Sequence, residues 1–376
     1  MKRIFGTVFL VLAAGVLAYG IHAADAKVSG QCSTCHTMHN SQNGVPMAYD
    51  AKGNSVAAPN EDLLRSDCVG CHSSTTANET VKSGVIPVVF DTAGYPSTPL
   101  AGGNFYYTSL GGSANDSKGH NVAGIAAADS ILINGPPGFK TGVAKPDGFI
   151  QSGSGWGITS WSGEQLNCAG AQGCHGDRSV ENTSSMSAVS GGHHGDDSVI
   201  DGTTVVRSYR FLAGIKGVEM NTSGHQWEQD ANASYHNGYY GVADRSSTNT
   251  ISYLCAECHG NFHSKTGGTV TNGLGSPWLR HPTDVSLSLL TDPDYDVYRV
   301  DIPVAYAGND GSAPVTGTAS PPDVNGIVMC LSCHRAHGSD QPDLLRFNYT
   351  AGTTKAGQDT SKANATGCLV CHAAQR

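Results

Sequence analysis

Every cysteine in the chain belongs to a pair whose second member is followed directly by a histidine. The 12 cysteines among 376 residues form six such units, and none is left over. Two thiols followed by a histidine are the pattern for covalent haem attachment, in which the imidazole becomes an axial iron ligand. The predicted attachment sites are Cys32, Cys35 and His36; Cys68, Cys71 and His72; Cys168, Cys174 and His175; Cys255, Cys258 and His259; Cys330, Cys333 and His334; and Cys368, Cys371 and His372.

Other uses of paired cysteines fit this pattern less well. A disulfide framework does not require a histidine after each pair. Zinc sites close with a second cysteine pair or a distant histidine, not with the next residue six times over. We therefore predict six haem c groups. In the third unit five residues separate Cys168 from Cys174, and a plain disulfide between these two cysteines is the alternative there.

The first residues have the order of a secretory signal peptide. Lys2 and Arg3 precede an apolar run from Ile4 to Ala18, and small residues follow it. This order predicts a signal peptide over residues 1–26, cleaved near residues 23–26. The apolar run is too short for a typical membrane span. We therefore expect an exported chain that does not span the membrane, located extracellularly or at the outer surface, or alternatively in the periplasm.

The composition predicts a chain with little regular secondary structure. Charged residues make up only 14% of the sequence, against about 25% in typical proteins, and 48 residues are glycine. We predict a fold that is mostly coil, with short helices at the haem motifs and few strands. It would form a single hexahaem domain over residues 27–376, with stacked haems as its core. The formal charge of −9 without a basic cluster argues against nucleic acid as a partner.

The remaining histidines are candidates for the second axial ligand of each iron. Nine histidines lie outside the motifs and the predicted signal peptide, and six haems with two histidines each need six of them. We predict the distal ligands His39, His120, His194, His263, His281 and His337. The sequence leaves open whether the ligand assigned to His194 is instead His193, His225 or His236, although the last two are expected to pack against aromatic neighbours.

Three of these predicted ligands follow a motif histidine closely. His39, His263 and His337 lie three or four residues after the motif histidines His36, His259 and His334. The two axial ligands of one iron lie on opposite faces of the porphyrin, so a residue this close cannot reach the same iron. Each would therefore serve a different haem, or none. Such a short connection between two irons predicts close packing of the haems and a continuous path for electrons.

Several segments resemble the hexahaem c-type cytochromes that polymerise into conductive filaments on the outer surface of cells. The resemblance runs in order along the chain and is carried by residues 32–41, 118–121, 279–282, 330–337, 343–348 and 368–372. It implies a coil-rich subunit whose chain of haems with two histidine ligands continues into the next subunit. In that family an N-terminal histidine ligates a haem of the neighbouring protomer. The matching position is His39, and the matching acceptor is the haem on Cys330, Cys333 and His334.

The third motif departs from the family pattern. The family has two residues between the cysteines there and a further histidine soon after the motif, whereas Gly176, Asp177 and Arg178 follow His175 in this chain. The expected function is an electron conduit that is not an enzyme, with other copies of the chain, redox proteins or extracellular acceptors as partners. The alternatives are a monomeric periplasmic or extracellular electron carrier and, third, a multihaem reductase. A reductase would need an iron with an open face.

Overall fold

The structure is a computed structural model of the whole chain. It describes residues 28, 30–50, 54–129, 136–137, 165–180, 185–263, 281–290, 295, 298–311, 325–349 and 366–372. The predicted signal peptide and its cleavage site lie outside these residues.

Regular secondary structure is short throughout the described residues. The α-helices are α2 (Cys32–Cys35), α3 (Cys68–Cys71), α4 (Tyr106–Ser109), α5 (Ser185–Ala188), α6 (Ile251–Ala256), α7 (Gly260–His263) and α8 (Cys330–Cys333). The 3-10 helices are η1 (Glu61–Leu63), η2 (Asp116–Lys118), η3 (Gly192–His194), η4 (Tyr209–Phe211), η5 (Gln226–Glu228), η7 (Leu287–Leu289), η8 (Pro342–Leu344) and η10 (Gly367–Val370). Glycine and small polar residues favour turns over long helices, which explains this pattern.

The strands are equally short. They are β1 (Ser41–Gln42), β2 (Val45–Pro46), β3 (Ala48–Tyr49), β4 (Ser55–Val56), β5 (Ser73–Ser74), β6 (Val81–Lys82), β7 (Ile86–Pro87), β8 (Phe90–Asp91), β9 (Gly217–Val218), β10 (Gly238–Tyr240), β11 (Val285–Ser286), β12 (Ala305–Tyr306) and β13 (Ile327–Val328). The predicted fold class, mostly coil with short helices and few strands, is thereby confirmed.

One five-stranded sheet organises the second half of the chain. Its order is β11-β13-β12-β10-β9, with β10 and β12 parallel and the other neighbours antiparallel. Successive strand residues point to opposite faces: Ala305 and Ile327 join one apolar cluster, whereas Tyr306 and Val328 join the other. The first cluster contacts Cys255 and includes Leu331, and the second contacts Cys371. The sheet therefore supports the fourth, fifth and sixth motifs.

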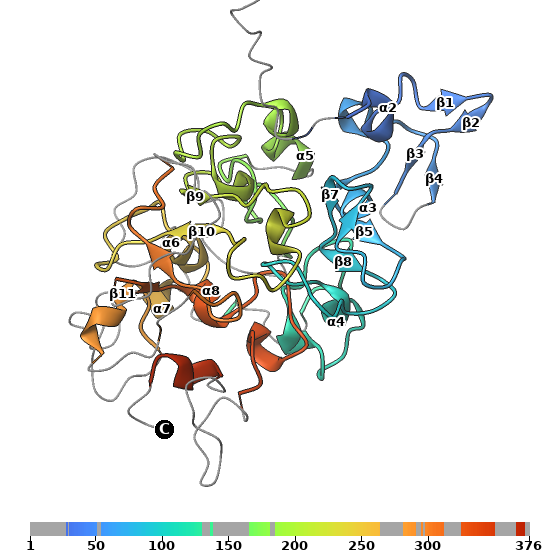
Figure 1. Cartoon of the computed structure of the whole chain (residues 1–376). Helices are drawn as coiled ribbons and strands as arrows, with labels where there is room; N and C mark the ends of the chain where they lie inside the picture. Colours follow the sequence, from blue (N-terminus) through green and yellow to red (C-terminus); the bar gives the residue numbers. More distant parts are fainter. Residues whose placement is uncertain are drawn as a thin grey trace, which may run out of the picture.

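The N-terminal residues form a separate lobe. The lobe contains α2 and the two hairpins β1-β2 and β3-β4, and it projects from one side of the molecule, away from α6 and α8 (Figure 1). The buried side chain of Asn40 holds the hairpins together, because its amide group bonds to backbone groups of Met47, Ala48 and Val56. The lobe carries His36 and His39. Among the described residues no helix is long and apolar enough to cross a bilayer.

Candidate haem-binding sites

In the five motifs with two residues between the cysteines, the two thiols and the histidine lie on one tight turn. The first cysteine begins the turn, and the backbone N–H of the motif histidine donates to its carbonyl oxygen. These N···O distances are 2.8 Å at His36, 2.9 Å at His72, 2.9 Å at His259, 3.1 Å at His334 and 3.0 Å at His372. The motif thus fixes the position of its histidine relative to both thiols.

The third motif reaches the same geometry despite its longer spacing. The backbone N–H of His175 donates to the carbonyl oxygen of Cys168 at 3.0 Å, as in the other motifs. The intervening residues fold into a compact loop, in which a Cβ atom on Gly173 would lie 2.6 Å from the backbone nitrogen of Ala169. Cys168 and Cys174 are separate thiols and form no disulfide. The longer loop therefore leaves the thiol–thiol–histidine arrangement in place.

Backbone carbonyls orient the motif histidines. In five of them the Nδ1 atom donates to a backbone carbonyl oxygen. The bonds run from His36 to Asp62 at 2.9 Å, from His72 to Pro87 at 2.9 Å, from His175 to Arg210 at 2.8 Å, from His259 to Pro137 at 2.6 Å and from His334 to Asp343 at 2.6 Å. A carbonyl oxygen can only accept, so Nδ1 carries the proton in each ring. The Nε2 atom of the neutral imidazole then has a free lone pair, which is the form that binds a metal.

The first, third and fifth sites share a left-handed turn that the sequence analysis missed. The positive φ angles are 55° and 54° at Asp62 and Leu63, 50° and 60° at Arg210 and Phe211, and 58° and 57° at Asp343 and Leu344. The carbonyl of the first turn residue accepts from the motif histidine. The carbonyl of the second accepts from the backbone N–H of the residue that follows the motif histidine. One sequence signal was available: residues 62–65 and 343–346 both read Asp-Leu-Leu-Arg.

Five of the six motif histidines lie beside a second histidine. The pairs, with the distances between ring centres, are His36 with His194 at 5.9 Å, His72 with His193 at 6.4 Å, His175 with His337 at 6.2 Å, His259 with His120 at 6.3 Å and His372 with His281 at 6.1 Å. Each pair combines one motif histidine with one histidine from elsewhere in the chain.

This spacing fits one iron between two imidazoles. With metal–nitrogen bonds of about 2 Å on each side, two imidazole centres on opposite sides of a metal lie roughly 6 Å apart. The five distances fall between 5.9 and 6.4 Å. Burial lowers the pKa of His337 to about 3 and that of His259 to about 4, with the paired histidine contributing in each case. Both rings are therefore neutral and able to bind iron. The residues fit haem c with two histidine ligands.

The adjacent residues His193 and His194 serve two different motifs. His194 faces His36, and His193 faces His72. The sequence analysis expected a ligand from only one of these two residues. The 3-10 helix η3 points neighbouring side chains in different directions, which allows one dipeptide to face two sites.

The structure places His263 away from the role predicted for it. Its ring is buried and bonds through Nε2 to the carboxylate of Asp284, which is also buried. Two further histidines pack as expected: His225 stacks on Tyr235 with ring centres 4.0 Å apart, and His236 stacks on Tyr298 at 3.5 Å. His193, which the sequence analysis left as an alternative to His194, faces His72. Helix α7 is only one turn long and directs His263 into the protein, which sequence spacing alone does not reveal.

Two predicted ligands remain without a histidine beside them. Among the described residues no histidine ring contacts His39 or His334, and both side chains are exposed. His334 keeps the Nδ1 bond to a carbonyl that orients the other motif histidines. Within one subunit the described residues thus provide one motif histidine, His334, without a histidine opposite it, and one exposed histidine, His39, outside the pairs.

Contacts between sites connect the motifs in chain order. Burial raises the pKa of Cys71, Cys258 and Cys333, and a nearby thiol of the adjacent motif raises it further. That thiol belongs to Cys35, Cys174 and Cys371, respectively. Interaction with Cys168 raises the pKa of Cys68, and interaction with Cys330 raises that of Cys255, so the thiols of these two pairs also lie close together. Every motif therefore adjoins the next one, and the six sites form a series from the first to the sixth.

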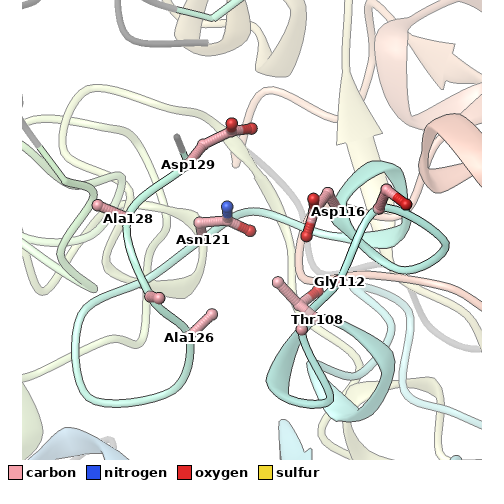
Figure 2. Close-up of a pocket in the computed structure, with 10 residues that line it drawn as sticks. Thr108, Gly112, Asp116, Asn121, Ala126, Ala128 and Asp129 are labelled. Carbon is pink, nitrogen blue, oxygen red and sulfur yellow. The ribbon is translucent and has the colours of Figure 1, made fainter. Parts of the chain in front are cut away.

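A cavity lies beside the segment that carries His120 but outside the histidine pairs. Its volume is about 350 Å³, and Thr108, Asp116, Asn121 and Asp129 are among the residues that line it (Figure 2). No cysteine or histidine lines it. The cavity is therefore separate from the haem-binding residues.

Comparison with known proteins agrees with this site chemistry. Residues 323–376 match the family described as Doubled CXXCH motif. C-type cytochrome OmcS of Geobacter sulfurreducens is 26% identical over 402 aligned positions, which cover 91% of this chain and 84% of that protein.

Two solved structures are also similar. The Outer Membrane Cytochrome S Filament from Geobacter sulfurreducens has a TM-score of 0.45 and 19% identity, covering 86% of this chain and 85% of that one. The cryo-EM structure of OmcS nanowires from the same organism has a TM-score of 0.44 and 18% identity. The match covers 93% of this chain and 94% of that one. The chain thus carries six c-type haem attachment motifs and resembles OmcS over nearly its whole length.

Proposed function

We propose that the chain binds six haem c groups and carries electrons along them as a subunit of an extracellular filament. The observation that carries the proposal is the set of five histidine pairs, each with its ring centres about 6 Å apart and each containing one motif histidine. When bound, haem c supplies one-electron exchange between ferric and ferrous iron. The relative OmcS is named as a nanowire and a filament, which favours the same assembly here.

The protein's own residues hold this series together. His120 faces His259, yet its Nδ1 donates at 2.6 Å to the carbonyl oxygen of Ala336, between His334 and His337. His337 in turn faces His175. The third, fourth and fifth sites are therefore fixed to one short segment, which limits changes in the distances between them. Close and constant spacing is what electron transfer along a series requires.

The unmatched histidines support contact between subunits. His334 needs a second ligand, and His39 is exposed on the N-terminal lobe, which lies apart from α8 (Figure 1). Met38, which precedes His39, is 86% exposed, and Val45 in strand β2 of the same lobe is 57% exposed. Exposed apolar side chains around a spare ligand are suited to a protein interface. We propose that His39 of one subunit ligates the haem at His334 of the next.

The alternatives use the same residues differently. A monomeric carrier would leave the haem at His334 with one histidine. A reductase would use that open face as its substrate site. A filament uses both His39 and His334, so it is the function in which every motif histidine has a second histidine opposite it. We further propose that residues 1–26 direct export, that the filament lies outside the cell and that the protein is not an enzyme.

The test is electron microscopy and spin-state analysis of the full haem-loaded protein and of His39→Ala. The unchanged protein should form regular filaments in which all haems are low-spin. The variant should stay dispersed, with one high-spin haem per subunit, because one iron then lacks its second imidazole. A change in assembly without a change in spin state would contradict the role of His39 as a ligand.

His225→Ala is the matched control. Its ring stacks on Tyr235 and bonds to Asp230, outside every motif. This variant should retain filaments and six low-spin haems. Filaments with six low-spin haems formed by His39→Ala would refute the proposal. If the protein without substitutions stays as discrete subunits with one high-spin haem, the carrier or the reductase is favoured. A substrate-turnover assay then separates these two.

A further inference from the structure

We infer that Arg346 and Arg335 raise the reduction potential of the haem on Cys330, Cys333 and His334, the site at the junction between subunits. The inference rests on the proposed function, because it assumes that this site holds haem. It assigns to two buried or half-buried cations a role in setting the energy of the electron at this point in the series.

Arg346 places a positive charge beside the fifth motif. Its Nε donates to the carbonyl oxygen of Leu331 at 2.6 Å and to that of His334 at 3.1 Å. Its Nη1 and Nη2 donate to the carbonyls of Val300 at 3.2 Å and Ala101 at 3.0 Å. All four acceptors are neutral. Among the described residues no carboxylate forms an ion pair with this guanidinium.

Arg335 brings a second positive charge to the same place. It follows His334 directly, and its Nη1 donates to the carbonyls of Leu100 at 3.0 Å and Ala101 at 3.3 Å. Both guanidinium groups therefore share the carbonyl oxygen of Ala101. Arginine side chains are charged at neutral pH, so both groups carry a positive charge there, although their proximity is unfavourable.

A nearby carboxyl group offsets this charge only in part. Glu228 is 4% exposed, and its Oε1 accepts from the backbone N–H of Asn237 at 2.5 Å. Burial raises its pKa to about 7, against the smaller lowering effects of Arg346, Arg210 and Arg335. The carboxyl group is therefore only partly ionised at neutral pH. The carboxylate of Asp343 adds a second negative charge that acts on His334. Two arginines against Asp343 and a partly ionised Glu228 still leave a net positive charge.

A net positive charge next to a redox centre favours its reduced form. Ferric haem carries one more positive charge than ferrous haem, so nearby cations destabilise the oxidised state and raise the reduction potential. Low polarity around the cluster strengthens this effect, because burial reduces screening by water and salt. The direct contact of Arg346 with the carbonyl of His334 places the charge at the ligand itself.

The first site provides a matched comparison. Arg65 occupies the same position as Arg346 in the repeated Asp-Leu-Leu-Arg segment, and its Nη1 contacts the carbonyl of Ser33, the position equivalent to Leu331. This contact is 3.5 Å long, and the guanidinium carbon lies 5.9 Å from the ring centre of Tyr49. Within the described ranges no second arginine shares a carbonyl with Arg65, so its influence should be confined to the first site.

The experiment measures the midpoint potential of the fifth haem selectively. In the full-length, haem-loaded His39→Ala protein this haem should be the only high-spin one, so its EPR signal can be followed while a mediator supplies or removes one electron. Arg346→Gln in this background should change the ratio of reduced to oxidised fifth haem about tenfold at a fixed potential, lowering its midpoint by about 59 mV. Arg346→Lys keeps the charge and should restore most of the loss, whereas Arg65→Gln should leave this signal unmoved.

An unchanged midpoint in Arg346→Gln would overturn the inference. An equal loss in Arg346→Lys would also overturn it, because it would mean that the hydrogen bonds matter and the charge does not. If the His39→Ala protein shows no high-spin haem, the proposed ligation has failed. An optical titration of all six haems in the unchanged background then decides the inference: Arg346→Gln must lower one midpoint potential and Arg346→Lys must not.

Discussion

Replacing Glu228 by glutamine should remove a pH-dependent loss of stability. The side chain is buried beside Tyr209, Tyr239 and Tyr298, with Arg210, Arg335 and Arg346 as the nearby cations. Burial raises its pKa from 4.5 to about 7. The folded state therefore binds more protons than the unfolded state between about pH 4.5 and pH 7, and stability falls as the pH rises through this range. The full effect is about 3 kcal/mol in the free energy of unfolding.

The assay is unfolding in guanidinium chloride from pH 4.5 to pH 8, followed by circular dichroism and haem absorbance. The amide of Glu228→Gln keeps an oxygen for the N–H of Asn237 but stays neutral at every pH. The variant should match the unchanged protein at pH 4.5 and exceed it by up to about 3 kcal/mol at pH 8. Glu61→Gln, which removes an exposed carboxyl group, is the control. Parallel stability curves for Glu228→Gln and the unchanged protein would refute the reasoning.

Two further predictions concern ligands and close packing. His193→Ala and His194→Ala should each produce one high-spin haem, and the double variant two, as counted by EPR; one high-spin haem in the double variant would mean that a single site uses both residues. Gly103→Ala should destabilise the protein by about 2 kcal/mol or more, because φ is +86° and the new Cβ atom would lie 1.9 Å from the carbonyl oxygen of Gly338. Gly112→Ala, with φ of +81° and open space around it, should cost only about 1 kcal/mol in the same unfolding assay.

The sequence predicts the covalent chemistry better than the pairing of ligands. Thiol and histidine positions are set by spacing within a few residues, so the motif histidine bonds to the carbonyl of the first cysteine in all six motifs. The third motif, at Cys168, does so through a loop and not through the short helix expected at each motif. The distal histidines depend on which distant segments meet. His193 and His263 illustrate this limit: both are histidines near glycine, but one faces His72 and the other is buried against Asp284.

The fold shows the same division. Short elements follow from the glycine-rich composition, whereas the five-stranded sheet joins segments from Gly217 to Val328 through strands of two or three residues. Such strands carry too few residues for an alternating pattern to be recognised. The left-handed turns at Asp62 and Asp343 lack glycine, so only their repeated sequence could have indicated them.

The proposed ligand pairs also set the order in which the haem sites can be completed during biogenesis. If the chain emerges from the export machinery N-terminus first, the first two sites can acquire haem long before His193 and His194 become available. The third site must wait for His337, near the end of the chain, whereas the fourth already has His120. Immature subunits would thus pass through states with several incompletely ligated irons. If the chain is exported and its haems are ligated as proposed, these intermediates would need protection from oxidants.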